Sequence, residues 1–107
     1  MNRKITSVSL LVLLISICSI NSQQWQPLNG PHGGSVRAFL SEGPFIYAGF
    51  SPGGVYRSSN NGSSWQPVNE GIDRFDLDIR SLVSHNGKIF AGSINGLYTS
   101  TNSGINW

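Results

Sequence analysis

Three arginines in strand-like segments are the first candidates for chemistry in this chain. Arg37 and Arg80 each follow a β-branched residue in two similar runs, Val-Arg-Ala-Phe-Leu at 36–40 and Ile-Arg-Ser-Leu-Val at 79–83. Arg57 follows Gly-Val-Tyr in a third run. Guanidinium groups bind carboxylates through paired hydrogen bonds. We therefore select these arginines as possible contacts to a protein or glycan partner. The alternative is that they are solvated or paired with nearby acids.

The acidic and histidine residues do not form the pattern of a metal site. Asp73, Asp76 and Asp78 lie close together between two strand-like runs, but their spacing is not that of a calcium-binding loop. His32 and His85 each lack a second zinc-type ligand nearby. We predict no metal site and expect the acidic segment to be a solvated loop.

Nucleophiles and phosphate-binding loops are also not indicated. The Gly-Pro-His-Gly-Gly run at 30–34 lacks the lysine and the helix that follow a phosphate loop. Cys18, the single cysteine, lies in an apolar N-terminal segment and would be lost if that segment is cleaved. We predict no catalytic residue and no cofactor, and a cleaved chain with no thiol for a disulfide.

Residues 1–22 have the features of a secretory signal peptide. Arg3 and Lys4 precede an apolar run at 8–17, and Ser19 and Ser22 offer small residues for cleavage. Serine and threonine interrupt the longer apolar segment at 6, 7, 9, 16 and 19, so a permanent membrane anchor is the less favoured alternative. We expect an exported protein, periplasmic, extracellular or at the cell surface, with no membrane association after cleavage.

The charge that remains after cleavage argues against nucleic-acid binding. The full chain has seven basic and five acidic residues, which gives a formal charge of +2. Without Arg3 and Lys4, five basic residues remain against the five acidic ones. No basic stripe is left to attract nucleic acid or anionic lipid.

An internal repeat is the strongest pattern in the sequence. Ser-Ser-Asn-Asn-Gly-Ser-Ser-Trp at 58–65 returns as Ser-Thr-Asn-Ser-Gly-Ile-Asn-Trp at 100–107. Trp-Gln-Pro-Leu-Asn at 25–29 also matches Trp-Gln-Pro-Val-Asn at 65–69. The runs between are rich in β-branched and aromatic residues and are bounded by turn formers. The pattern predicts strands at 24–28, 36–41, 45–50, 54–59, 65–69, 79–84, 88–93 and 96–100, with another beginning at residue 107.

Two dipeptides predict tight turns between these strands. Asn86-Gly87 and Asn95-Gly96 are each flanked by strand-like runs, and both central residues of a type I′ turn need positive φ. No window shows a sustained helical period, so we expect no helix outside residues 1–22.

Four short antiparallel strands in each repeat of about forty residues predict an all-β fold built from β-propeller blades. Residues 23–107 would then form a partial propeller, with blade one at 36–69 and an incomplete blade two at 79–107. The strand at 24–28 would be a closing strand that completes the last blade of the ring. We expect the chain to be the N-terminal part of a longer protein, because further blades are needed to close the ring.

The repeated octapeptide resembles the Asp-box, or BNR repeat, usually written S-x-D-x-G-x-T-W. This repeat occurs in sialidases, sortilin-type receptors, xyloglucan-cleaving endoglucanases and photosystem II assembly factors. The resemblance implies a structural turn on the outer rim of a propeller, away from the ligand-binding face. Asparagine replaces the aspartate in both copies and keeps an acceptor oxygen without the charge. By this resemblance, the residues of this chain with the structural role are Ser58, Asn60, Gly62, Trp65, Ser100, Asn102, Gly104 and Trp107.

The same resemblance argues against catalysis by these residues. Xyloglucan-cleaving relatives carry an acid just before the paired glycines that open the third strand, and Ser51 stands in that place here. Serine cannot act as one of the two carboxyl groups that inverting hydrolysis requires. A sialidase site would need arginines, a tyrosine and acids from several further blades.

Three functions remain open from the sequence. The first is an exported, non-catalytic propeller that serves as a binding or assembly scaffold. The second is the N-terminal part of a secreted glycoside hydrolase, sialidase-like or xyloglucanase-like, with its catalytic acids outside this chain. The third is a structural repeat of a cell-surface or adhesive protein. We favour the scaffold.

Overall fold

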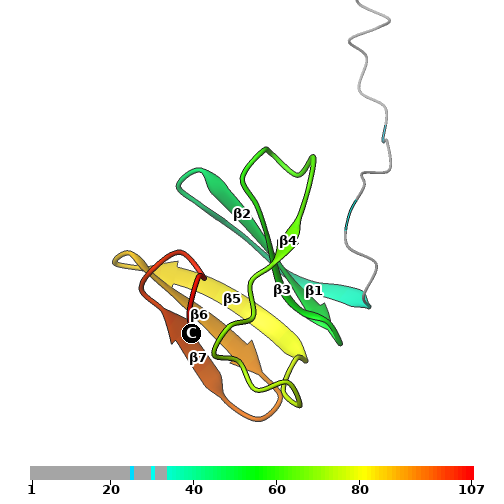
Figure 1. Ribbon diagram of the computed structural model, residues 1–107, viewed down its shortest axis with the longest axis vertical. Coiled ribbons are helices and arrows are strands. Elements are labelled where there is room, and N and C mark those ends of the chain that lie inside the picture. Colours follow the sequence, from blue (N-terminus) through cyan, green and yellow to red (C-terminus); the bar gives the residue numbers. More distant parts are fainter. Residues whose placement is uncertain (1–24, 26–29, 31–33) are drawn as a thin grey trace, which may run out of the picture.

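Two antiparallel sheets make up the structure, a computed structural model that describes residues 25, 30 and 34–107 (Figure 1). Sheet A has four strands in the order of the sequence, and sheet B has three. The strands of sheet A are β1 (Ser35–Glu42), β2 (Phe45–Ser51), β3 (Gly54–Ser58) and β4 (Gln66–Pro67). Those of sheet B are β5 (Ile79–His85), β6 (Lys88–Ser93) and β7 (Leu97–Ser100).

The expectation of an all-β fold is confirmed for residues 34–107, which contain no helix. Within the described residues, no helix is long and apolar enough to cross a membrane. The signal peptide expected at 1–22 lies outside the described residues. So does the strand expected at 24–28, apart from the fully exposed Trp25.

The fourth strand of sheet A is shorter than predicted, because a side chain replaces part of its backbone pairing. The sequence predicts a strand over 65–69, but β4 contains only Gln66 and Pro67. Beyond it, the N–H of Val68 still donates to the Val55 carbonyl at 2.9 Å. The Val55 N–H then donates to Asn69 Oδ1 at 2.7 Å, and the chain leaves the sheet.

The two predicted hairpin turns have different outcomes. Asn86 and Gly87 have φ values of 50° and 75°, so the left-handed turn between β5 and β6 is confirmed. The type I′ turn predicted at Asn95-Gly96 is wrong, since neither residue has a positive φ. There the N–H groups of Asn95 and Gly96 donate to Ser93 Oγ at 3.3 and 3.0 Å. Hydrogen bonds to the Ser93 hydroxyl thus stabilise this turn without any left-handed residue.

A bulge interrupts the first pairing of each sheet at the same place. In sheet A the register shifts between Val36 and Ala38, so Arg37 is the extra residue. In sheet B it shifts between Ile79 and Ser81, so Arg80 is the extra residue. A bulge bends its strand and turns the extra side chain out of the regular alternation. The two arginines therefore occupy equivalent positions in the two sheets.

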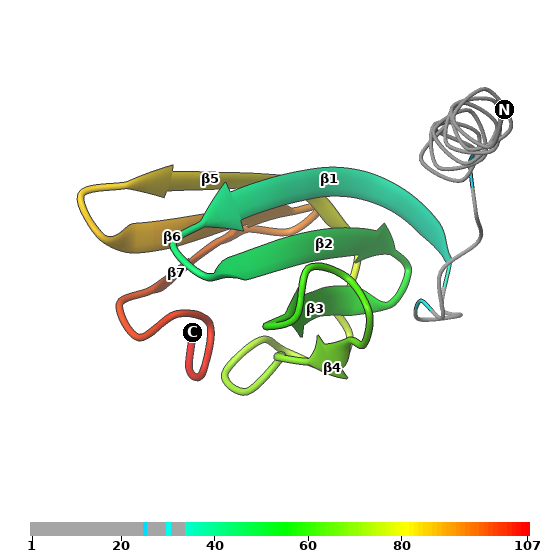
Figure 2. The same ribbon diagram turned by 90° about the horizontal axis from the view of Figure 1, so that it is seen from above.

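The sheets stack face to face and are closest at their first strands. Figure 2 shows β1 and β5 side by side and running in the same direction. β5 contacts both β1 and β2. The core between the sheets contains Tyr47 and Val55 from sheet A and Ile79, Leu82, Ile89 and Ala91 from sheet B. The tight fit of Gly49 against Ile79 leaves no room for a side chain, because an added Cβ would lie 2.7 Å from Ile79 Cγ2.

The segment 68–78, which connects the sheets, is fastened to sheet A through its carbonyl groups. The N–H groups of Gly53 and Gly54 both donate to the Leu77 carbonyl, at 3.0 and 2.9 Å. Gly54 has a φ of +81°, and a Cβ there would lie 2.5 Å from Asn69 Oδ1. The paired glycines thus let the start of β3 approach the connecting segment closely.

We predict that Gly54→Ala lowers the free energy of unfolding by about 2 kcal/mol or more, through left-handed strain together with displacement of Asn69. Urea unfolding followed by tryptophan fluorescence measures the loss. Gly43→Ala is the matched control, because Gly43 has a φ of +58° but no atom lies within 4 Å of an added Cβ. The control should lose only about 1 kcal/mol, and equal losses would contradict the role of the Asn69 contact.

Candidate functional site

Both copies of the repeated octapeptide form the same turn around a buried serine hydroxyl. Ser58 Oγ accepts the N–H groups of Gly62 and Asn60, at 2.8 and 3.3 Å, and donates to Asn60 Oδ1 at 2.9 Å. In the second copy, Ser100 Oγ makes the equivalent contacts at 2.9, 3.4 and 2.9 Å with Gly104 and Asn102. Each hydroxyl is fully used within its own turn.

The asparagine amide oxygens hold the second half of each turn. Asn60 Oδ1 accepts the Ser64 N–H at 2.9 Å, and Asn102 Oδ1 accepts the Asn106 N–H at 3.0 Å. In the first turn Asn60 Nδ2 also donates to Ser64 Oγ at 2.7 Å. The amide oxygen therefore acts in both turns as the acceptor that the sequence predicts at this position. The serine hydroxyls and asparagine amides of the turns are thus paired within their own turns, as expected for residues with a structural role.

Backbone conformation in the two turns is also matched. Asn61 and Gly62 have φ values of 58° and 87°, and Ser103 and Gly104 have values of 59° and 83°. A pair of consecutive left-handed residues reverses the chain sharply, and glycine at the second position adopts this conformation without strain.

The two turn tryptophans lie on corresponding faces of their sheets. Trp107 packs against the core between the sheets, and its Nε1 donates to the Val68 carbonyl at 2.7 Å. Its own N–H donates to the Glu70 carbonyl at 2.9 Å. Trp65 donates to the Gly62 carbonyl at 3.1 Å and lines a hollow on the opposite face of sheet A.

The second turn joins the two sheets through one carbonyl group. Ser103 O accepts hydrogen bonds from Tyr47 Oη at 2.9 Å and from Arg57 Nη1 at 2.8 Å. The Arg57 guanidinium also lies over the Phe45 ring, 4.2 Å from its centroid. Burial raises the pKa of the Tyr47 hydroxyl, which keeps it a donor. Arg57, selected from the sequence as a possible partner contact, is thus held at the interface between the sheets.

Arg37 and Arg80 are instead exposed, on the first strands of the two sheets. Arg80 forms an ion pair with Asp78, in which Nε and Nη2 each lie 3.2 Å from a carboxylate oxygen. Hydrogen bonds from Arg80 and then from Ser51 hold the Asp78 pKa below its usual value, helped by the charges of Arg80 and Arg37. These four side chains form a polar edge, which we call the arginine edge.

Asp76 is the site residue that the sequence did not reveal. Its buried carboxylate accepts hydrogen bonds from Ser93 Oγ at 2.7 Å, Tyr98 Oη at 2.9 Å and Asn95 Nδ2 at 3.2 Å. The expectation of a solvated acidic loop is therefore wrong for Asp76, because the carboxylate fastens the connecting segment to the β6–β7 hairpin. Its counterpart segment before β1 contains no acid, so the repeat gave no signal for it.

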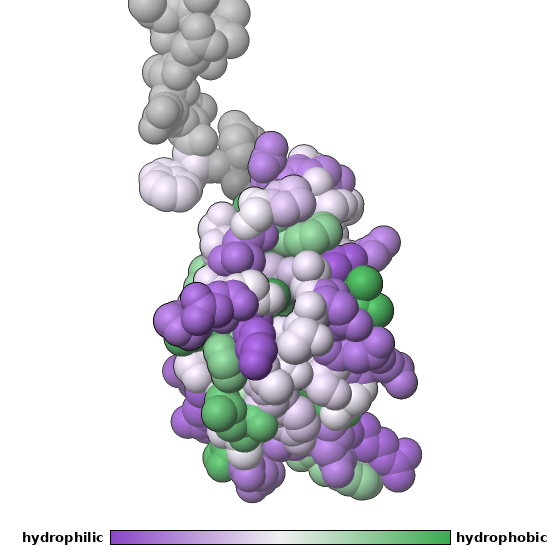
Figure 3. All heavy atoms as spheres, turned by 90° about the vertical axis from the view of Figure 1, so that its left-hand side faces the viewer, coloured by the Kyte–Doolittle hydropathy of each residue, from purple (hydrophilic) through white to green (hydrophobic). Residues whose placement is uncertain are grey.

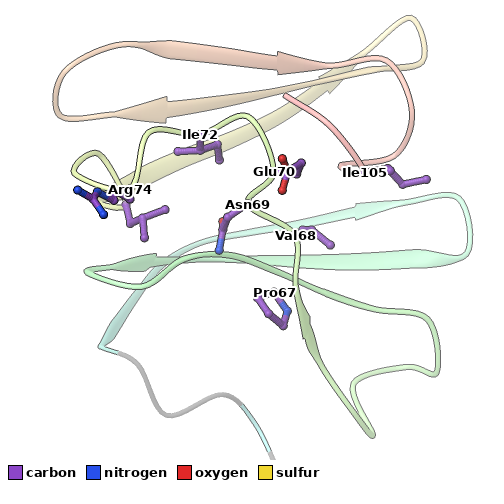
Figure 4. A pocket seen from close by; sticks show the side chains of 8 residues that line it. Pro67, Val68, Asn69, Glu70, Ile72, Arg74 and Ile105 are labelled. Carbon is purple, nitrogen blue, oxygen red and sulfur yellow. The ribbon is translucent and has the colours of Figure 1, made fainter.

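A depression of about 510 Å³ lies between the connecting segment and the second turn (Figure 4). Apolar side chains line most of it, and Glu70 and Arg74 supply its charged groups. Among the described residues, no buried side-chain polar atom lacks a hydrogen-bond partner. The depression therefore contains no buried polar side-chain atom that is left without a partner, and its charged groups Glu70 and Arg74 are exposed.

Glu42 and Asp78 are not placed as a carboxyl pair for glycoside hydrolysis. Glu42 is the last residue of β1, whereas Asp78 directly precedes β5, which runs in the same direction (Figure 2). The two carboxyl groups thus lie about one strand length apart, roughly 20 Å. Paired hydrolytic carboxyls lie within about 10 Å of one another. The described residues also contain no group of three or more potential metal ligands.

Comparison of the chain with protein-family models, with curated proteins and with solved structures finds no significant match. The class that the structure defines is therefore an all-β protein of two stacked antiparallel sheets with repeated terminal turns.

We predict that Asn60→Asp raises the free energy of unfolding at neutral pH by about 0.5 to 1.5 kcal/mol, because a charged acceptor strengthens the bonds from Ser58 and Ser64. Urea unfolding at pH 7 checks this. The gain should vanish as the pH falls and the new carboxylate becomes protonated. Asn61→Asp is the matched control, since Asn61 is the exposed neighbour in the same turn. A gain of equal size in the control would contradict the acceptor role.

We predict that the connection between the segment 68–78 and sheet B weakens in acid, because it depends on the ionised Asp76 carboxylate. The hydroxyl of Ser93, assisted by Tyr98 and Asn95, holds the pKa of Asp76 below its usual value despite burial. Its contribution to stability is therefore present above the ordinary aspartate pKa of about 4 and is lost as the pH falls through the lower folded pKa.

Asp76→Asn should accordingly reduce the dependence of the thermal midpoint on pH between about pH 5 and pH 2. It should also lower the midpoint at pH 7. Asp73→Asn is the control, because the exposed Asp73 carboxylate accepts the backbone N–H of Phe75, at 2.9 Å, and does not bind the β6–β7 hairpin. An unchanged pH slope in Asp76→Asn would show that this carboxylate does not connect the two parts.

Proposed function

We propose that sheets A and B are consecutive blades of a β-propeller, and that this propeller is an exported, non-catalytic scaffold for binding or assembly. One observation carries the proposal: the two sheets match in strand order, in the position of the bulge and in the terminal turn. They also meet at their first strands, as blades arranged around a central channel do.

The arginine edge is the surface that we propose for partner binding. Arg37 and Arg80 lie at equivalent bulges of neighbouring strands, and both are exposed. Asp78 compensates one of the two positive charges by its ion pair with Arg80. A ligand carboxylate can pair with Arg37 directly and can compete with Asp78 for Arg80, because the ion pair is solvated. Acidic groups on a protein or on a glycan fit this chemistry.

The turn residues and Arg57 are assigned to the scaffold rather than to partner binding. Ser58, Asn60, Ser100 and Asn102 direct their polar atoms into their own turns. Arg57 is bound to the Ser103 carbonyl. Polar groups that are already paired within the protein gain little by exchanging those partners for a ligand.

We predict that a fluorescent hexaglutamate peptide binds the full chain at low ionic strength, and that Arg37→Gln combined with Arg80→Gln weakens this binding at least about tenfold. Fluorescence anisotropy measures the affinity, with a hexaglutamine peptide as the uncharged probe. Arg74→Gln is the matched control, because Arg74 is an exposed arginine of the connecting segment whose guanidinium lies over the Phe75 ring and is not at a bulge. Equal effects of the control and the double variant would contradict the proposed edge.

The non-catalytic part of the proposal is tested on the same preparation. Chromogenic sialosides and glucosides should show no turnover, since Glu42 and Asp78 lie at opposite ends of their strands. Turnover that disappears on Glu42→Gln or Asp78→Asn would overturn this part.

A further inference from the structure

The internal repeat allows each face of one sheet to be compared with the same face of the other. The bulges and turns fix the correspondence of residues between the sheets. We call face one the face through which sheet B packs on sheet A. On this face, Val36, Phe39 and Ala48 of sheet A correspond to Ile79, Leu82 and Ala91 of sheet B. We call face two the face through which sheet A packs on sheet B. On this face, Leu40, Tyr47 and Val55 of sheet A correspond to Val83, Phe90 and Leu97 of sheet B.

Face one is buried in sheet B, whereas in sheet A its β1 residues are exposed and Ala48 of β2 is 2% exposed. Ile79 and Leu82 are 0% and 7% exposed, because sheet A packs over them. Their counterparts Val36 and Phe39 are 45% and 65% exposed. A hollow of about 250 Å³ lies beside them, lined almost entirely by apolar groups that include Trp65. Sheet A therefore presents an apolar face of the kind that a neighbouring sheet covers elsewhere in this molecule.

Face two has the reverse distribution. Val55 of sheet A is 0% exposed and Leu40 packs against the core, since sheet B covers both. Their counterparts in sheet B, Leu97 and Val83, are 71% and 55% exposed. Large apolar side chains are thus exposed on both outer faces, and Figure 3 shows hydrophobic residues in green at the surface among hydrophilic ones.

We propose that a second copy of this chain stacks on the first head to tail, with face one of its sheet A on face two of sheet B. The molecule already contains this contact once, between its own two sheets. A second copy offers the same faces at corresponding positions, with Val36 and Phe39 meeting Val83 and Leu97. Because two different faces meet, every copy keeps one open face, and repetition leads to a ring or to an open array.

The open faces favour a copy of this chain over an unrelated partner. The exposed residues at the four positions named are all aliphatic or aromatic, so the surface offers shape and apolar area but no charge pattern. The fit of such a surface to its counterpart is demonstrated inside the molecule, where Ile79 and Leu82 pack against Tyr47 and Val55. This inference rests on the correspondence of the two sheets and not on ligand binding at the arginine edge.

Sedimentation velocity of the full chain over a concentration series tests the proposal. Wild type should associate, and Phe39→Asp and Leu97→Asp should each weaken association about a hundredfold or more, because each buries a charge in the contact. Both side chains are exposed in the single chain, so the fold should persist, which circular dichroism checks. Phe75→Asp is the matched control, since Phe75 is 79% exposed on the connecting segment and should leave association unchanged.

Mixing the two variants distinguishes a head-to-tail contact from other arrangements. Leu97→Asp retains an intact face one and Phe39→Asp retains an intact face two, so their mixture should form a one-to-one dimer that grows no further. Association of either variant alone at wild-type strength, as expected for contacts through residues 1–33 or between like faces, would overturn the proposal. A monomeric wild type, or a failure of the mixture to dimerise, would also overturn it. Should either variant unfold, Val36→Asp and Val83→Asp replace it on the same faces.

Discussion

The hydroxyl groups of Ser58 and Ser100 are the constraint on which the other features depend. Each is buried and accepts two backbone N–H groups at the point where the chain must reverse. This fixes the left-handed pair that follows and the direction in which the tryptophan leaves. In the second repeat it also fixes the Ser103 carbonyl, which Tyr47 and Arg57 bind to join the sheets.

Much of the architecture could be predicted from the sequence, because the repeated residues have local preferences for strands and turns. The strands, their order of succession and the left-handed turn at Asn86-Gly87 follow from local preferences that act within a few residues. The structural use of Asn60 and Asn102 follows from the acceptor oxygen that the motif requires. The shortened β4 and the turn at Asn95-Gly96 did not follow, since side-chain oxygens accept the backbone N–H groups there, from Asn69 at β4 and from Ser93 at the turn.

The candidate binding surface was harder to predict from the sequence for a related physical reason. Arg37, Arg57 and Arg80 look alike in the sequence, yet only contacts across the sheet interface separate Arg57 from the other two. Asp76 lies in a segment whose counterpart before β1 contains no acid, and its hydrogen-bond partners are 17 to 22 residues away. Hydrogen bonds over such separations depend on the packing of the sheets, which local sequence patterns do not encode.

The hydrogen bonds from Tyr47 and Arg57 to the Ser103 carbonyl have no equivalent in the second repeat. Tyr47 and Arg57 correspond to Phe90 and Thr99, which have neither a hydroxyl on the ring nor a guanidinium to offer a neighbouring turn. A contact built on sheet B would therefore rely on apolar packing, while the contact inside the chain also has oriented hydrogen bonds. In the stacking that we propose, force should therefore separate one copy from the next before it separates the two sheets within a copy.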